Sequence, residues 1–350
     1  MSSLNYYLER INYALMLLLP IGIIIGPFFS DGIIAITSLL FLINYLFYKN
    51  SVVINLHKYI YIFFFLFCVY LIFLSFLSKN ILLSLESSLF YFRFGIFVIN
   101  FQNILSNNKY FFKLFSIISI FTFLFVIIDA IFQYLVGVNF LLMSYDDHRL
   151  SGIFGDEKIL GSYLSRTLPL IIMYSLFLLS NRKYKNIFIF SLLAISSVLI
   201  LLSGERTAII YFIIFYILFL ILTFNFGQIK IWSLISIILI SSILLIKENS
   251  VKDRVIDFTK FQLNISNELD HGRIRLFSIQ HETIYITSIK IIKDNLFIGI
   301  GPKMFREICK KEKYQTLTSL DGSINGCQTH PHNSYIQLLV ETGIFGFLSL

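Results

Sequence analysis

The residues best suited to chemistry are two histidines that stand directly before an apolar segment, in the stretch HPHNSYIQLLVETGIFG at 330–346. Ser334 and Gln337 have the spacing of a capping box, so we expect a helix that begins at Asn333 or Ser334. His332 would then precede the positive end of that helix, which disfavours a charged imidazolium. A neutral imidazole can accept a proton, so His332 is a candidate general base.

The two histidines are open to two other interpretations. A histidine beside a helix is often a structural group that is satisfied by hydrogen bonds. His330 and His332 could also bind a metal ion, but a spacing of i,i+2 across a proline is unfamiliar for ligands, and neither a cysteine nor a carboxylate stands beside them. We therefore expect no metal and no cofactor, with Asn333 and His330 in supporting roles.

Arginines form the second group. Arg206 lies in SGERT, a break of a few residues between two apolar segments. A guanidinium there could anchor a helix pair at the bilayer interface, or it could bind phosphate through two parallel hydrogen bonds. Glu205 could pair with Arg206 and so weaken its hold on phosphate.

Two further segments carry arginines between apolar stretches. HGRIR contains Arg273 and Arg275, which would be solvated surface residues unless other groups bury them. Arg149 opens the sequence RLSGIFGDEKILGSYLSR, a polar loop that runs into the next apolar segment. The sequence has no Walker loop, no GxGxxG and no Asp-x-Asp pair, so nothing in it indicates chemistry driven by a nucleotide.

Membrane helices must position these residues. The 350-residue chain is 57% hydrophobic, 17% aromatic and only 14% charged, with a mean hydropathy of +0.80, which lies outside the soluble globular range. Apolar runs of about 20 residues match the bilayer core as helices. The sequence therefore predicts an all-α, polytopic membrane bundle of about ten spans. They are expected near residues 11–29, 32–48, 59–77, 82–105, 114–136, 159–180, 187–203, 207–226, 230–246 and 334–350.

Charged residues inside these spans are expected to face the bundle interior, where they can find partners. Glu86 and Arg93 in the fourth span could pair with each other. Arg166 in the sixth span could pair with Asp129 or with Glu86.

The net charge of +8 comes from basic residues scattered between the apolar runs, which indicates a lipid bilayer and not a nucleic acid as the partner. Nine lysines and arginines of the short loops fall on the N-terminal side and four on the other, so the N-terminus is predicted to be cytoplasmic. The first set is Arg10, Lys49, Lys58, Lys109, Lys113, Arg182, Lys183, Lys185 and Lys230. The second, outward set is Lys79, Arg149, Lys158 and Arg206.

The chain divides into three predicted regions: N-terminal transmembrane helices at 1–246, a large and partly helical outward loop at 247–333, and the start of a C-terminal transmembrane helix at 334–350. The last span ends without a polar flank, so we expect that one or two helices follow it in the full protein. Cys309 and Cys327 share the loop and could form a disulfide in an oxidising compartment, although the sequence does not give their distance.

Taken together, these pieces resemble the O-antigen ligase and O-antigen polymerase superfamily of bacterial envelope glycosyltransferases. SGERTAII is similar to the small-Gly-x-Arg-Thr hairpin of that family, and HGRIRLF is similar to its Gly-Arg stretch. HNSYIQLLVETGIFG is similar to its His-Asn signature, and GIGPKMF also fits. The resemblance covers roughly 149–350, and the piece from His-Asn to Gly-x-x-Gly is its most specific part.

The resemblance implies transfer of a glycan from an undecaprenyl-pyrophosphate carrier to an acceptor hydroxyl, at the periplasmic face of the bacterial inner membrane, without a metal and with inversion. Such a reaction belongs to the biosynthesis of lipopolysaccharide or a related polysaccharide. Arg206 and Arg273 would bind the pyrophosphate, with help from Arg149 or Arg275, and His332 would deprotonate the acceptor.

Several alternatives stay open at this point, including related polymerases for capsule or exopolysaccharide and ligases that glycosylate proteins. A ligase would use lipid A core as the acceptor, whereas a polymerase would use another glycan repeat. A metal-dependent glycosyltransferase acting on lipid-linked sugars would use acidic residues of the outer loops, and a chelator would inhibit it. A non-enzymatic transporter or flippase would favour internal repeats and polar residues near the bilayer midplane, but here the polar groups lie at one surface.

Overall fold

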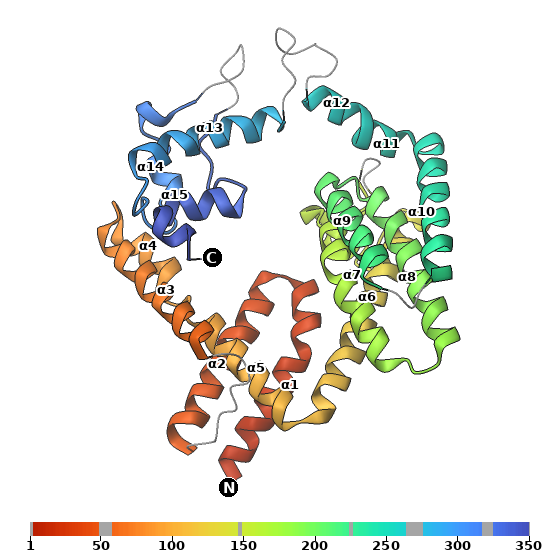
Figure 1. The fold of residues 1–350 in the computed structure, drawn as a ribbon, viewed down its shortest axis with the longest axis horizontal. Helices are drawn as coiled ribbons and strands as arrows, with labels where there is room; N and C mark the ends of the chain where they lie inside the picture. The colour runs from red at the N-terminus through yellow and green to blue at the C-terminus, as the bar shows by residue number, and fades with distance from the viewer. Residues whose placement is uncertain are drawn as a thin grey trace. The chain divides into compact units, whose positions relative to one another are not determined.

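The computed structural model describes residues 3–48, 58–145, 149–223, 227–263, 276–316 and 325–349. Within these ranges the regular structure is helical, apart from an isolated bridge between Val138 and Ser144 (Figure 1). The prediction of an all-α fold is confirmed.

Seven helical segments of the described chain are long and apolar enough to cross a membrane. In six of them a single helix forms the segment, whereas α4 and α5 together form the seventh. Their bounds are α1 (Ser3–Ile25), α2 (Pro27–Tyr48), α3 (Lys58–Leu77), α4 (Ile81–Ser88), α5 (Arg93–Asn107), α6 (Lys109–Val136), α8 (Arg182–Leu202) and α10 (Gly227–Lys247). The prediction of a multi-pass membrane protein is confirmed.

Two more predicted spans coincide with α7 (Leu160–Leu178) and with the shorter α9 (Arg206–Leu222). Large aliphatic side chains on α9, among them Ile213 and Ile217, are about half exposed in the protein alone. A bilayer would cover such surfaces, and backbone groups that bond within a helix need no water there.

The helices group into two compact units. Unit 1 consists of Met1–Asn12, Ile34–Asn103 and Lys260–Leu350, and unit 2 consists of Tyr13–Ile33 and Ile104–Thr259. This division cuts across the regions expected from the sequence, because the first part of the predicted outward loop belongs to unit 2 and the rest belongs to unit 1.

The bundle of unit 2 is built around α7, which contacts α6, α8 and α9, while α10 packs on α8 (Figure 1). Leu160, Leu164 and Leu168 of α7 are fully buried. They recur at intervals of four residues, so they form one apolar stripe that faces the neighbouring helices.

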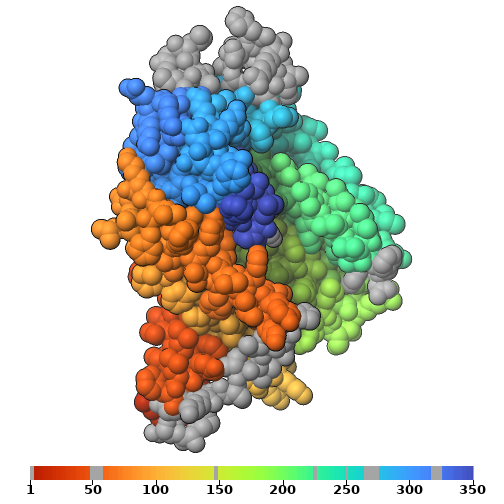
Figure 2. Space-filling model, turned by 60° about the vertical axis from the view of Figure 1, so that its left-hand side comes forward, coloured from red at the N-terminus to blue at the C-terminus, as the bar shows by residue number. Residues whose placement is uncertain are grey.

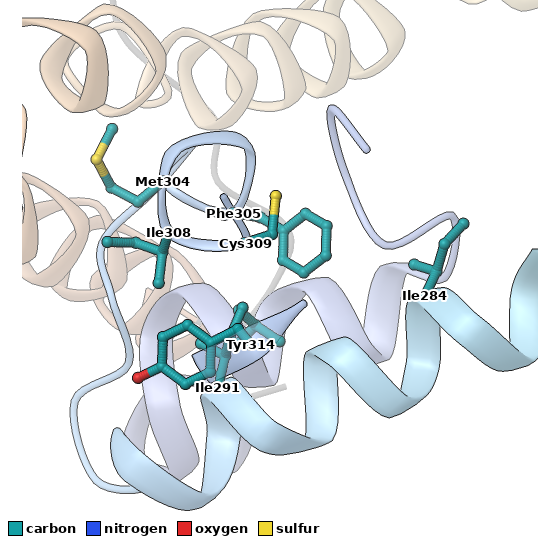
Figure 3. Packing of buried hydrophobic residues seen from close by; sticks show 8 residues of the cluster. Ile284, Ile291, Met304, Phe305, Ile308, Cys309 and Tyr314 are labelled. Atoms are coloured by element: carbon teal, nitrogen blue, oxygen red, sulfur yellow. The ribbon is translucent and has the colours of Figure 1, made fainter. Parts of the chain in front are cut away.

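The part of unit 1 that follows 275 has a hydrophobic core of its own (Figure 3). The elements around this core are α13 (Ile279–Asp294), α14 (Phe305–Ile308), the short 3-10 helix η4 (Glu312–Tyr314) and α15 (Ser334–Phe347). Both α13 and α14 lie in the outward loop that the sequence predicted to be partly helical. Ile291 of α13 faces Tyr314, with Phe305 and Cys309 on the adjacent turn (Figure 3).

A disulfide fastens this core. Cys309 and Cys327 are bonded, with Cα atoms 5.1 Å apart, so the pairing that the sequence left open is present in the structure. The bond brings the chain that leads to His330 against the end of α14.

The same part of unit 1 packs against α3 and α4, as Figure 2 shows for the blue and orange segments. Lys303 Nζ lies 3.0 Å from the Glu86 carboxylate, and the Tyr70 hydroxyl donates to the Thr342 carbonyl at 2.8 Å. The prediction that Glu86 pairs with Arg93 is therefore wrong, because the partner of Glu86 comes from 217 residues later in the chain.

The helix expected at 334–350 differs from a straight span. It forms α15, a helix of 14 residues that is interrupted at Gly343, where φ is 65° and ψ is −171°. Only glycine adopts such a backbone readily. The apolar composition of the segment suggested its location but did not reveal the break.

Candidate functional site

The turn between α8 and α9, residues 203–206, is called the arginine hairpin below. Gly204 has a φ of 64° and ends α8, and its N–H donates to the Leu201 carbonyl at 3.0 Å. A left-handed residue at this position is the common way to end a helix, and glycine adopts it without strain. Arg206 is therefore the first residue of α9 because the chain reverses at Gly204.

Glu205 does not pair with Arg206. Its carboxylate accepts hydrogen bonds from the backbone N–H of Gly161 at 2.8 Å and of Ser162 at 3.1 Å, and from the Ser162 hydroxyl at 2.6 Å. These are the free N–H groups of the first turn of α7, so Glu205 caps a helix that is distant in sequence. The expected weakening of Arg206 by Glu205 is thus wrong.

Arg149 is fixed to the same hairpin. Its Nε donates to the Ser203 carbonyl at 3.2 Å and its Nη2 donates to the Lys158 carbonyl at 2.9 Å, while the N–H of Leu150 donates to the Leu202 carbonyl at 3.1 Å. These hydrogen bonds hold the Arg149 guanidinium beside the arginine hairpin.

Arg206 shares an aromatic neighbour with a third arginine. The guanidinium carbon of Arg206 lies 5.5 Å from the centre of the Phe258 ring, and that of Arg254 lies 4.9 Å from the same ring. Arg206 Nη1 also donates to Thr259 Oγ1 at 3.4 Å. The segment that brings these groups to the hairpin runs through α11 (Asn249–Lys252), a π-helical turn η3 (Asp253–Asp257) and α12 (Phe258–Gln262).

The three guanidiniums create a region of positive charge in unit 2. Burial, followed by the like charges of Arg254 and Arg149, lowers the pKa of Arg206. Within the described chain, no carboxylate forms an ion pair with Arg206 or Arg254. Two neighbouring guanidiniums that form no ion pair within the described residues are suited to an anion with several charges.

The segment from Cys327 to Asn333, called the histidine loop below, belongs to unit 1. The ring centres of His330 and His332 are 4.2 Å apart, and those of His332 and His281 are 6.0 Å apart. His281 stands in the first turn of α13, and its Nδ1 lies 2.6 Å from Ser278 Oγ. The structure thus adds His281 to the two histidines predicted from the sequence.

Asn333 caps α15, because its side-chain oxygen accepts from the N–H groups of Tyr335 at 3.0 Å and Ile336 at 3.1 Å. The helix begins at Ser334, as predicted, but the expected capping box of Ser334 and Gln337 is not formed. Gln337 Nε2 instead donates to Glu341 at 3.3 Å.

His332 has a left-handed backbone with a φ of 54°, and histidine is one of the residues that tolerate this region. His330 is placed differently, with its Nδ1 3.0 Å from Thr329 Oγ1. Burial lowers the pKa of His330, and the electrostatic influence of His332 and Arg306 lowers it further. The loop therefore favours neutral imidazole at His330.

A pairing of two backbone segments, 296–301 with 340–345, positions α15, and we call it the backbone clamp. Ile300 N–H donates to the Val340 carbonyl at 3.0 Å, Gly301 N–H to Glu341 at 2.9 Å and Ile344 N–H to Leu296 at 2.8 Å. A Cβ on Gly299 would lie 2.5 Å from the carbonyl carbon of Glu341. The glycines of the GIG and TGIFG pieces thus allow two main chains to touch.

The site residues predicted from the sequence that the structure describes are divided between the two units. Arg206 and Arg149 belong to unit 2, whereas His332, His330 and Asn333 belong to unit 1. Arg273 and Arg275 lie outside the described residues.

Two residues differ from expectation. Arg166 pairs with neither Asp129 nor Glu86; its guanidinium lies 5.4 Å from the ring centre of Tyr211, while Asp129 accepts from the Phe140 N–H.

Arg254 was not predicted as a site residue, because the stretch KDRVID is typical of a solvated charged surface. An aromatic residue four positions after an arginine, just beyond a span, was the available signal.

In the described part of the chain, no group of three or more His, Cys, Asp or Glu side chains is arranged to hold a metal ion. Residues 191–350 match the family model described as O-antigen ligase. The match includes the arginine hairpin, the histidine loop and the backbone clamp, while Arg149 lies before it. No curated protein and no solved structure matches the chain.

Proposed function

Because residues 191–350 carry the domain of the O-antigen ligase and polymerase superfamily, we propose that this multi-pass membrane protein is a glycosyltransferase. It would move a glycan from undecaprenyl-pyrophosphate to an acceptor hydroxyl at the periplasmic face of the bacterial inner membrane. The observation that carries the proposal is the pair of guanidiniums of Arg206 and Arg254, with which no described carboxylate forms an ion pair.

Donor binding is assigned to Arg206, with Arg149 beside it. A guanidinium stays charged near neutral pH and can give two parallel hydrogen bonds to a phosphate. Glu205 is committed to the N-terminus of α7, so Arg206 keeps its charge for a ligand. Arg273 and Arg275 are proposed to assist, as the family resemblance implies.

Leaving-group stabilisation follows from the same residues. When the bond between the anomeric carbon and the pyrophosphate oxygen breaks, the pyrophosphate departs with the electron pair. Fixed guanidinium donors stabilise that charge without having to reorganise. The proposed reaction therefore requires no metal ion.

Acceptor activation is assigned to His332. Its neutral imidazole would take the hydroxyl proton while the acceptor oxygen bonds to the anomeric carbon from the face opposite the pyrophosphate, which inverts that carbon. The Asn333 cap and the backbone clamp fix the position of this histidine, and His330 supports it.

The outward orientation is supported by the Cys309–Cys327 disulfide. Such bonds persist in oxidising compartments and are rare in the cytosol. We propose that the N-terminus is cytoplasmic and that the histidine loop is periplasmic. The acceptor is either lipid A core, in a ligase, or another carrier-linked repeat, in a polymerase.

The test is a transfer assay with the full chain in lipid bilayers, a labelled undecaprenyl-pyrophosphate oligosaccharide and each acceptor in turn, with EDTA present. We expect transfer to one acceptor and an inverted linkage in the product. Activity that returns only when a divalent ion is added would favour the metal-dependent alternative. Movement of the labelled carrier across the bilayer without a new glycosidic bond would favour a flippase.

A further inference from the structure

We propose that Arg254 is a further donor-binding residue and that Phe258 is the positioning residue that holds Arg254 and Arg206 side by side, so that this part of unit 2 recognises a diphosphate in preference to a monophosphate. The inference rests on the proposed function for the identity of the donor. Its geometry stands on residues 206 and 254–259 of one unit.

Phe258 provides a common surface for two cations. Both guanidinium carbons lie within about 6 Å of its ring centre, the range in which a cation is attracted to the face of an aromatic ring. Two like charges would otherwise separate. The ring therefore offsets part of their repulsion and restricts both side chains to one place.

Both guanidiniums have capacity left for a ligand. Arg254 Nε is buried and has no hydrogen-bond partner in the described chain. Asp253 and Asp257 flank Arg254 in the sequence, yet neither forms an ion pair with it. A buried donor without a partner is costly, and a phosphate oxygen would relieve that cost.

Two guanidiniums match two phosphoryl groups. Each planar guanidinium can bind one phosphate through two hydrogen bonds, so Arg206 and Arg254 together can engage both halves of a pyrophosphate. A monophosphate presents one group and can use only one of the two arginines fully. The pair thus gives a chemical basis for distinguishing the loaded carrier and its diphosphate product from the monophosphate carrier.

The experiment measures binding of undecaprenyl diphosphate and undecaprenyl monophosphate to the full chain in lipid nanodiscs. We expect wild type to prefer the diphosphate, and Arg254→Gln to lose about tenfold or more of diphosphate affinity while monophosphate affinity changes little. Phe258→Leu should lose part of the preference, and Phe258→Tyr should keep it because the ring remains. Arg166→Gln is the matched control, since Arg166 also lies over an aromatic ring but is exposed.

The outcomes separate this inference from the proposed function. Equal binding of the two lipids by wild type would overturn it, as would an unchanged preference in Arg254→Gln that has the same melting temperature as wild type. Diphosphate preference that depends on Arg254, in a chain that transfers no glycan to either acceptor, would support the inference and count against the proposed function. A similar loss in Arg166→Gln would show a general charge effect and overturn the specific role of Arg254.

Discussion

Arg206 and Arg254 in unit 2 are oriented directly by neighbouring side chains, whereas His332 in unit 1 is positioned through the backbone segments on either side of it. An aromatic ring orients the two arginines, and a carboxylate from the arginine hairpin fastens that hairpin to α7. The histidine loop lies between a disulfide and a capped helix, and that helix is fixed by the backbone clamp.

The contrast suggests that the two regions respond to different kinds of substitution. In unit 2 the type of each side chain determines how the arginines are held, so conservative replacements should show which chemical property matters. In unit 1 the glycines and the helix cap determine where His332 lies. A single added methyl group at a glycine should therefore be more harmful there than a change of an exposed polar residue.

The largest expected effect comes from removing the proposed base, His332, while the arginines stay in place. His332→Ala should lower the transfer rate by about 100- to 10,000-fold, the usual contribution of a general base, and donor binding should persist. Arg206→Lys should instead weaken donor binding, because ammonium cannot reproduce the two parallel bonds. Transfer and binding of labelled carrier-linked oligosaccharide are measured in membranes.

Ser334→Ala is the matched control for His332→Ala, because Asn333 and not Ser334 caps α15. Normal turnover in His332→Ala would remove the base assignment. If the transfer rate of Arg206→Lys depends on donor concentration as in wild type, Arg206 serves only as a helix anchor.

A methyl group at the backbone clamp should have the next largest effect. Gly343→Ala places a Cβ against the Phe297 carbonyl and forces a side chain into a backbone conformation that costs about 1–3 kcal/mol. We expect a lower thermal unfolding temperature and lost transfer. Gly32→Ala, where no atom lies within 4 Å of the added group, is the control. Equal stability of the two variants would contradict the clamp.

Removal of the Glu205 carboxylate tests whether the attachment of the arginine hairpin to α7 matters in unit 2. Glu205→Ala removes three hydrogen bonds at the start of α7, and charge-assisted bonds contribute about 1.5–3 kcal/mol each at most. We expect reduced stability together with weaker donor binding, because the hairpin loses its attachment. Glu205→Gln should retain part of both. Tighter donor binding in Glu205→Ala would instead mean that Glu205 competes for Arg206.

The smallest expected effect is on the stability of the protein at acidic pH. The folded protein lowers the pKa of His330, so the unfolded chain binds more protons at that position once the pH falls below about 6.5. Stability that depends on neutral His330 is thus present above that pH and is lost on acidification. His330→Gln should flatten this dependence in thermal unfolding scans between pH 5 and 8, and an unaltered profile would argue against it.

Local patterns made part of this molecule predictable. The apolar run lengths located the membrane helices, and the residue types at 203–206 and 330–333 indicated the two regions that carry the proposed site residues. Each of these signals lies within about 20 consecutive residues.

The remaining features depend on contacts between distant residues. Glu205 finds its partners 44 residues earlier in the chain, at Gly161, and Glu86 finds Lys303 far along it. Arg254 becomes notable only when Phe258 is placed against Arg206. The break at Gly343 exists because another main chain occupies that space, which no pattern within 334–350 reveals.

The disulfide and the backbone clamp close two loops, one inside the other. The inner loop begins and ends at Cys309 and Cys327, whose Cα atoms lie 5.1 Å apart. Reduction of the disulfide would therefore open only the inner loop, while the hydrogen bonds of the backbone clamp would still hold residues 296–301 against α15. The histidine loop would then lose one of its two anchors and keep the other.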